Sequence, residues 1–212
     1  MEIKVNNLYK SFKKVTIVNG VNITFSSGKV YGIIGQNGSG KSVFLKLLCG
    51  FYVPDSGEIY FDGIKLDAQY TYPKSTRALI ENPDFIPELT GFQNLKLLAS
   101  IQKTIDDEQI LDAMKIVNIY NEKDKKFGNY SLGMKQKLGL AQVIMENPDV
   151  MFFDEPLNGI EEDTAQEFRK YIQKIKKDKI IIVASHIRDD IEYLCDEVYK
   201  FQNGQLVKDE EK

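Results

Sequence analysis

Apolar and polar residues alternate over much of the first thirty positions, as in the segments VTIV at 15–18 and VNITF at 21–25. Alternation places every second side chain on the same face of an extended chain, which is typical of strands with one buried face. The N-terminal part is therefore predicted to form antiparallel strands. A continuous apolar run at 30–34 then predicts a buried strand, and helical spacing follows at 42–49.

The middle of the chain, from about 92 to 145, lacks strand-like runs. Its apolar residues recur three or four positions apart, and examples are Leu95, Leu98, Ala99, Leu138, Ala141 and Ile144. This spacing predicts amphipathic helices. We interpret the block as a helical arm inserted into the domain at about 82–146.

Strands and helices alternate in the remaining segments. Strands are predicted at 58–61, 77–80, 150–153, 180–184 and 198–201, and helices at 161–177 and 187–195. Such alternation predicts an α/β fold with a mostly parallel sheet and helices on its faces. The charged segment 208–212 is predicted to be a frayed tail.

The length and the net charge of the chain limit the functions that it could have. The 212 residues suit a single domain spanning 1–212, and the net charge of −3 gives no basic surface that would predict a nucleic-acid partner. The longest apolar runs are far too short to span a bilayer. The N-terminus carries no apolar secretory segment, so we expect the protein to stay in the cytoplasm.

The segment GQNGSGKS at 35–42 fits the phosphate-loop pattern G-x-x-x-x-G-K-[ST]. It lies between a predicted buried strand and a predicted helix, which distinguishes it from a chance glycine-rich turn. Backbone N–H groups of such a loop and the positive end of the helix bind phosphate. Lys41 is expected to reach the β- and γ-phosphates of ATP, and the Ser42 hydroxyl to ligate Mg²⁺. The remaining predicted cradle residues are Asn37, Gly38, Ser39 and Gly40.

Two acidic residues, Asp154 and Glu155, follow the apolar run at 150–153. A buried strand delivers such side chains to the carboxyl edge of a parallel sheet, where ligands bind. Alone, the pattern could equally be a strand end and a surface turn. Beside a phosphate loop, Asp154 is expected to hold Mg²⁺ and Glu155 to act as general base or to position the attacking water.

His186 is the single histidine of the chain, and it follows the predicted strand at 180–184. A lone histidine is more often structural than catalytic. Because this strand is expected to run parallel to the one that carries Asp154, we interpret His186 as a contact to the γ-phosphate.

The order of these motifs, together with SLGMKQ at 131–136, resembles the nucleotide-binding domain of ABC transporters over nearly the whole chain. The resemblance implies a P-loop NTPase core, an N-terminal antiparallel β subdomain and an inserted helical subdomain. It also implies ATP hydrolysis that drives transport through separate membrane-spanning subunits, from the cytoplasmic face of the membrane.

The resemblance assigns further residues. Phe12 corresponds to an aromatic residue that stacks on adenine, although it could be an ordinary core aromatic, and Val18 would flank the base. Ser131 and Gly133 correspond to the signature motif, which in this family faces the nucleotide on the other subunit. Hydrolysis would therefore need a head-to-tail dimer, formed with a second copy or with another nucleotide-binding subunit.

Several positions depart from the family pattern. Val43 replaces a hydroxyl residue, so only its N–H could serve the α-phosphate. Leu132, Met134 and Glu161 also differ from the usual residues. Glu81 replaces the glutamine that contacts Mg²⁺ or the attacking water. Glu81 and SLGMKQ together resemble the branch that protects bacteria against bacitracin-like and lantibiotic peptides, which implies export.

The alternative is an ABC ATPase that works with a non-membrane partner. Translation-type members carry two cassettes and repair-type members carry long coiled coils, and 212 residues hold neither. A cofactor-assembly scaffold remains open as a partner. In the transport reading, the groove around 82–92 receives the membrane subunit, and Phe85, Pro87 and Phe92 either contact that subunit or pack on their own domain.

Overall fold

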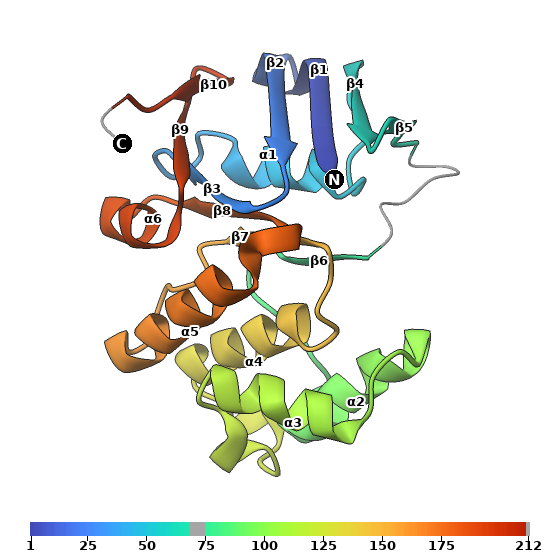
Figure 1. Cartoon of the computed structure of the whole chain (residues 1–212), viewed down its shortest axis with the longest axis vertical. Helices are drawn as coiled ribbons and strands as arrows, with labels where there is room; N and C mark the ends of the chain where they lie inside the picture. The colour runs from blue at the N-terminus through green and yellow to red at the C-terminus, as the bar shows by residue number, and fades with distance from the viewer. Residues whose placement is uncertain (68–74, 211–212) are drawn as a thin grey trace.

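The computed structural model describes residues 1–67 and 75–210, and Figure 1 shows their arrangement. The first half contains β1 (Glu2–Phe12), β2 (Val15–Ser26), β3 (Lys29–Ile34), α1 (Lys41–Leu48), β4 (Ser56–Phe61), β5 (Ile64–Lys65), β6 (Thr76–Leu79) and α2 (Gly91–Gln102). The second half contains α3 (Asp107–Ile116), α4 (Leu132–Ile144), β7 (Val150–Asp154), α5 (Glu162–Ile175), β8 (Ile180–Ser185), α6 (Arg188–Leu194), β9 (Glu197–Gln202) and β10 (Gln205–Lys208). Single-turn 3-10 helices lie at Tyr120–Glu122, Phe127–Asn129 and Lys176–Asp178.

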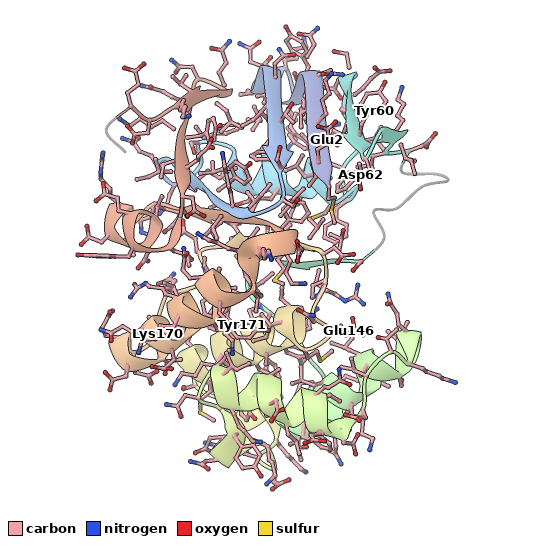
Figure 2. The ribbon with its side chains drawn as sticks, in the orientation of Figure 1. Glu2, Tyr60, Asp62, Glu146, Lys170 and Tyr171 are labelled. Carbon is pink, nitrogen blue, oxygen red and sulfur yellow. The ribbon has the colours of Figure 1, made fainter. Side chains whose placement is uncertain are left out.

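The N-terminal strands form an antiparallel sheet in the order β2-β1-β4-β5. Glu2 and Asp62, both labelled in Figure 2, join the start of β1 to the end of β4. The Glu2 N–H donates to Asp62 Oδ1 at 2.6 Å, and the Asp62 N–H donates to the Glu2 carbonyl at 3.0 Å. This is the antiparallel subdomain expected from the alternating N-terminal pattern.

The central sheet has the order β10-β9-β3-β8-β7-β6, and all its neighbouring pairs are parallel except β10 with β9. In register, Ile34 pairs with Ser185 and Asp154 pairs with Ala184. The carboxyl ends of β3, β7 and β8 therefore meet at one edge of the sheet. Ligands bind at this edge in parallel α/β folds.

Helix α1 lies between the two sheets (Figure 1). Its fully buried Phe44 and Leu48 share one core with Phe25 of the antiparallel sheet and with Phe152 and Ile182 of the central sheet. Each such side chain contributes about 1.5–3 kcal/mol relative to an exposed position. This packing fixes the helix that follows the phosphate loop.

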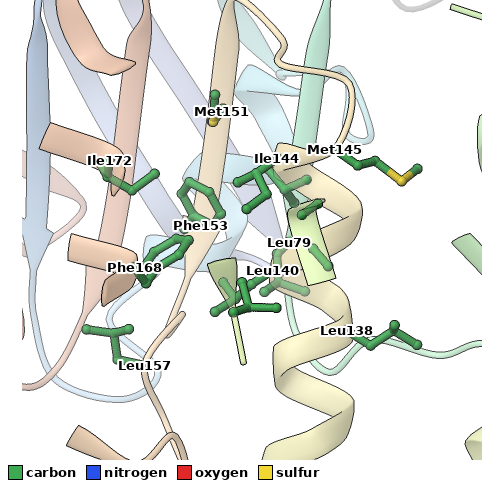
Figure 3. Packing of buried hydrophobic residues seen from close by; sticks show 14 of the residues in the cluster. Leu79, Leu138, Leu140, Ile144, Met145, Met151, Phe153, Leu157, Phe168 and Ile172 are labelled. Carbon is green, nitrogen blue, oxygen red and sulfur yellow. The ribbon is translucent and has the colours of Figure 1, made fainter. Parts of the chain in front are cut away.

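The other face of the central sheet packs on helices (Figure 3). Phe153 belongs to this part of the core, whereas Phe152 belongs to the core around α1. The Phe153 ring meets that of Phe168 of α5 edge-on, with ring centroids 5.5 Å apart at 85°. Ile172 of α5 and Leu140 and Ile144 of α4 complete this part of the core. Every residue of β7 is buried, and its first four residues form a continuous apolar run before Asp154.

Helices α2, α3 and α4 form the arm predicted from the helical spacing (Figure 1). A capping box starts α2: Thr90 Oγ1 accepts from the Gln93 N–H, and Gln93 Oε1 accepts from the Thr90 N–H. Glu146, labelled in Figure 2, follows α4 and forms an ion pair with Arg77 of β6, which ties the arm to the central sheet. Within 1–67 and 75–210, no helix combines the length and the apolar character needed to cross a membrane.

The predicted frayed tail is wrong for its first two residues. Lys208 ends β10, and Asp209 is only 3% exposed. The Asp209 carboxylate lies 3.0 Å from Lys200 Nζ and 3.7 Å from Arg188. These partners come from β9 and α6, so a local charge pattern could not reveal them. The prediction for 211–212 lies outside the described residues.

Candidate nucleotide site

A pocket of about 430 Å³ opens at the carboxyl edge of the central sheet. The loop between β3 and α1 forms one wall, and the end of β7 forms another. The pocket brings together the residues predicted from the sequence for phosphate, metal and water, namely Asn37, Gly38, Ser39, Gly40, Lys41, Ser42, Val43, Glu81, Asp154 and Glu155.

The phosphate loop depends on glycine at two positions. Gly38 and Gly40 have φ of 78° and 113°, in the region that disfavours residues with a side chain. A Cβ at Gly40 would lie 2.8 Å from Ile17 Cγ2 and 2.9 Å from Phe201 Cε1. The chain can therefore turn tightly there, and the N-terminus of α1 points its free N–H groups into the pocket.

Lys41 is 5% exposed and reaches back across the loop. Its Nζ donates to the carbonyls of Gly35 at 2.6 Å and Gln36 at 3.2 Å, and lies 3.9 Å from Glu155 Oε1. Burial lowers the pKa of Lys41, and the carboxylates of Glu155 and Asp154 oppose that shift. The charged form is thus held by neighbours that an anion could replace.

Ser39 carries a polar atom that is unsatisfied. Its Oγ is buried and has no hydrogen-bond partner among the residues that the structure describes. Buried hydroxyls nearly always have a partner. A phosphate oxygen in the loop would supply one, so the loop fits a phosphate-bearing ligand.

Asp154 and Ser42 provide oxygen atoms suited to Mg²⁺. Asp154 ends β7, is 6% exposed and accepts a hydrogen bond from Ser42. Burial raises the pKa of Asp154, the Ser42 hydrogen bond lowers it, and the nearby Glu155 raises it again. A hydroxyl and a carboxylate are hard donors of the kind that Mg²⁺ prefers, and a cation would relieve the buried negative charge. The donor set fits the metal.

Glu155 is held by the end of β8. Its Oε2 accepts from Ser185 Oγ at 2.8 Å, and its Oε1 accepts from the His186 N–H at 2.9 Å. The His186 side chain also approaches, with Nδ1 2.9 Å from Oε1. These donors fix the carboxylate beside the phosphate loop, and its role in orienting water stays a prediction.

The backbone of Glu155 is also held in place. Its φ is 49°, a conformation that few residues other than glycine adopt. Gln136 of α4 is 6% exposed and its Nε2 donates to the carbonyls of Glu155 at 3.0 Å and Pro156 at 3.2 Å. Helix α4 thereby fixes the turn that carries the catalytic candidate.

Glu81 lines the same pocket, at the point where the chain leaves β6 for the arm. Its backbone has φ of 64°, and its carboxylate forms an ion pair with Lys46 of α1. The predicted contact of Glu81 with Mg²⁺ stays a prediction.

Residues 18–158 match the family model described as ABC transporter. The chain belongs to the ABC transporter family. The match covers the phosphate loop, the arm and the acidic end of β7.

Named relatives support the more specific resemblance. The chain is 40% identical over 205 residues to the "Uncharacterized ABC transporter ATP-binding protein YybJ" of Bacillus subtilis (strain 168), covering 96% of this chain and 94% of that protein. It is 33% identical to the "Bacitracin transport ATP-binding protein BcrA" of Enterococcus faecalis, covering 98% and 68%. It is also 33% identical to the "Lantibiotic transport ATP-binding protein SrtF" of Streptococcus pyogenes, covering 99% and 90%. The resemblance to the bacitracin and lantibiotic branch is confirmed.

Solved structures confirm the predicted fold class. One is the "Dimeric structure of a post-hydrolysis state of the ATP-binding cassette MJ0796 bound to ADP and Pi", with a TM-score of 0.89 and 21% identity over 98% of this chain and 97% of that one. The fold is therefore that of an ATP-binding cassette.

The two base-contact candidates of this ABC cassette differ in their placement. Phe12 is 41% exposed at the end of β1, where its ring lies 5.4 Å from that of Tyr52 and the Lys10 ammonium lies over it, 5.3 Å from the ring centroid. Its stacking on adenine stays a prediction. The prediction for Val18 is wrong, because this side chain is fully buried in the core. Its neighbour Ile17 lines the pocket instead. Adjacent residues of a strand face opposite sides, so only one of the two can reach the site.

The signature residues stand at the start of α4. Ser131 is the N-cap, and its Oγ accepts from the Met134 N–H at 3.3 Å. A Cβ at Gly133 would lie 2.6 Å from the Gly159 carbonyl, so a larger residue would push the two loops apart. Leu132 is 67% exposed at the rim of the pocket. Ser131 and Gly133 are thus presented at the surface, and their contact with a second nucleotide stays a prediction.

Sequence reasoning missed four residues of the site. These are Ile17, Lys46, Gln136 and Ser185. Ser185 could have been found as the hydroxyl residue between a buried strand and His186. Gln136 lies in the segment SLGMKQ, but its contact with the turn after β7 could not be predicted from that segment. Lys46 acts through a partner far away in the sequence, and its own position carries no signal.

His186→Ala is expected to lower kcat about tenfold to a hundredfold, while KM for ATP changes by less than about threefold. The reason is that His186 contacts the carboxylate of Glu155, so its loss should disturb the reacting geometry more than ground-state binding. Steady-state ATPase measurements test this, with His186→Gln as the matched variant that keeps a polar side chain. Equal losses in kcat and in affinity would identify a structural histidine.

Proposed function

We propose that this chain is the Mg²⁺-dependent ATPase subunit of an ABC transporter that exports antimicrobial peptides through separate membrane-spanning subunits. One observation carries the enzymatic part: Lys41 and Ser42 at the start of α1, and Asp154 and Glu155 at the end of β7, converge on one pocket, with Ser42 hydrogen-bonded to Asp154. An anion site, a metal site and a water-orienting carboxylate are the parts that phosphoryl transfer to water requires.

Each group has a separate task in this mechanism. Lys41 leaves the carbonyls of Gly35 and Gln36 and binds the β- and γ-phosphates. Ser42 and Asp154 would hold Mg²⁺, and the metal would neutralise charge on the phosphates. Glu155, fixed by Ser185, accepts a hydrogen bond from the attacking water. It takes the proton of this water as the water oxygen bonds to the γ-phosphorus, and the bond from that phosphorus to the β–γ bridging oxygen breaks to release ADP.

Residues at the surface carry the proposals for adenine binding and for assembly with a second cassette. Phe12 offers its ring face to adenine, and Ile17 takes the flanking role first assigned to Val18. Residues 1–212 act as one nucleotide-binding domain, with the helical arm at about 82–146. Ser131 and Gly133 face the nucleotide of a second cassette in a head-to-tail homodimer or heterodimer, because Ser131 caps α4 and Gly133 lies in its first turn.

The membrane partner and the substrate class rest on the relatives. BcrA is named for bacitracin transport and SrtF for lantibiotic transport, and both cover nearly all of this chain. The partner's cytoplasmic segment would bind beside 82–92, where Ile86 is 44% exposed and Pro87 is exposed. Phe85 instead packs on Phe127 at 5.1 Å, so it supports the groove from within. The subunit would sit peripherally at the cytoplasmic face of the membrane.

Deleting the gene in its source organism is expected to lower the inhibitory concentration of bacitracin or of a lantibiotic by about fourfold or more. The parent gene should restore resistance, and the Glu155→Gln gene should not, because binding without turnover cannot drive transport. Both proteins should be recovered with the membrane fraction at equal levels. Unchanged resistance across the peptide panel would contradict the substrate class, and recovery with a non-membrane partner would favour the cofactor-assembly alternative.

A further inference from the structure

The ion pair between Glu81 and Lys46 joins two parts of the cassette. Glu81 stands where β6 leads into the arm, and Lys46 lies on α1, the helix that follows the phosphate loop. In the described part of the chain, Lys46 supplies the one ion pair of this carboxylate. The Glu81 side chain is 65% exposed, so it has room to change partners.

Lys46 is held more firmly than its partner. Its side chain is 19% exposed, and its Nζ lies 5.6 Å from the ring centroid of Tyr52. The Lys46 carbonyl accepts from the N–H groups of Phe51 at 2.9 Å and Tyr52 at 3.2 Å, which folds Tyr52 back toward the lysine. A cation fixed by an aromatic ring and by a helix loses little entropy on pairing.

Lys46 and the metal ligand Ser42 lie four residues apart in α1, which places them one turn apart on the same side of the helix. Glu81 lines the pocket that also holds Ser42 and Asp154. The carboxylate therefore faces two positive centres along one helix: the ammonium of Lys46, and the metal that Ser42 and Asp154 would hold.

We propose that Lys46 is a positioning residue that competes with the nucleotide-bound metal for Glu81. Without nucleotide, Glu81 is paired with Lys46. When metal and nucleotide occupy the pocket, Glu81 turns from the ammonium toward the metal or its water. Because Glu81 is the residue at which the chain leaves β6 for the arm, we expect the exchange to shift the first residues of the arm. This inference rests on the proposed function.

The exchange also explains how a carboxylate is accommodated at this position. The pocket already holds the carboxylates of Asp154 and Glu155, and Lys41 is their nearest cation. Lys46 balances the additional charge of Glu81 until the metal arrives. A neutral side chain at position 81 would not need that partner.

A double-mutant cycle on metal affinity tests the competition. Free Mn²⁺ is measured by electron paramagnetic resonance while it is titrated into the full chain with excess ADP. Lys46→Met is expected to tighten Mn²⁺ binding about two- to fivefold, because Glu81 no longer has a competing partner. In the Glu81→Gln background, Lys46→Met should leave Mn²⁺ affinity unchanged or only slightly tighter, because only the weak repulsion between the ammonium and the metal is then removed.

Lys46→Arg is the matched control, since it keeps the charge, and its Mn²⁺ affinity should stay within about twofold of the parent. Circular dichroism and thermal unfolding exclude a folding defect in each variant. An equal effect of Lys46→Met in both backgrounds would overturn the inference while leaving the proposed function intact. A parent chain that binds no Mn²⁺ with ADP would overturn both.

Discussion

Glu155→Gln is expected to reduce ATP turnover by at least about a hundredfold while ATP still binds. The substitution preserves size, and the amide can still use Ser185 Oγ and the His186 N–H as hydrogen-bond partners. It removes the negative charge that accepts a proton from water. Because hydrolysis opens the proposed nucleotide sandwich, the variant should accumulate as an ATP-bound dimer. Phosphate release and gel filtration with and without Mg·ATP measure the two effects.

Glu88→Gln is the control, since Glu88 is exposed and lies outside the pocket lining. It should hydrolyse ATP at the parent rate and should not form a trapped dimer. Turnover by Glu155→Gln at the parent rate would assign the water-orienting role to another group. A variant that stays monomeric with ATP would contradict the head-to-tail dimer.

Lys41→Ala is expected to weaken ATP binding by at least about a hundredfold. Its ammonium would bind two phosphates, and each charge-assisted hydrogen bond contributes about 1.5–3 kcal/mol, with each 1.4 kcal/mol equal to tenfold in affinity. Equilibrium titration with a fluorescent ATP analogue measures the loss. An unchanged affinity of Lys41→Ala for ATP would contradict the assignment of residues 35–42 as a phosphate loop.

A second variant at position 41 separates the effect of the charge on ATP binding from its effect on stability, and a lysine elsewhere serves as the control. Lys41→Met keeps most of the buried stem, so it should bind ATP as weakly as Lys41→Ala while retaining more stability. Lys170→Ala removes an exposed lysine from α5 and should leave ATP affinity unchanged. Thermal unfolding checks the loop, because Lys41 also bonds the carbonyls of Gly35 and Gln36.

Local sequence predicts those parts of the site that a short segment builds alone. The phosphate loop needs only consecutive residues between β3 and α1, and Asp154 and Glu155 follow directly from the buried run of β7. The mostly parallel character of the central sheet could be predicted from the alternation of strands and helices, but the order of its strands could not. The phosphate loop and the acidic end of β7 are predictable because residues that are neighbours in the sequence form them.

Two kinds of feature could not be predicted from the sequence. They depend on which face of a strand a residue occupies, or on a partner far away in the chain. Residues 15, 17 and 18 are all apolar, so the pattern cannot say whether Ile17 or Val18 faces the pocket, and the pairing of β1 with β2 contains register shifts. Gln136 and Glu155 lie nineteen residues apart, and Lys46 and Glu81 thirty-five. Only the folded chain brings such pairs together.

The two hydrogen bonds from Gln136 to the carbonyls of Glu155 and Pro156 have a consequence for an assembled pair of cassettes. Gln136 lies five residues after Ser131, so little more than one helical turn separates the presented end of α4 from the clamped turn. In the proposed dimer, Ser131 serves one ATP and Glu155 of the same chain serves the other. Each α4 would then connect the two ATP sites of the dimer rigidly. Release of phosphate from one ATP site would therefore alter the alignment of water at the other.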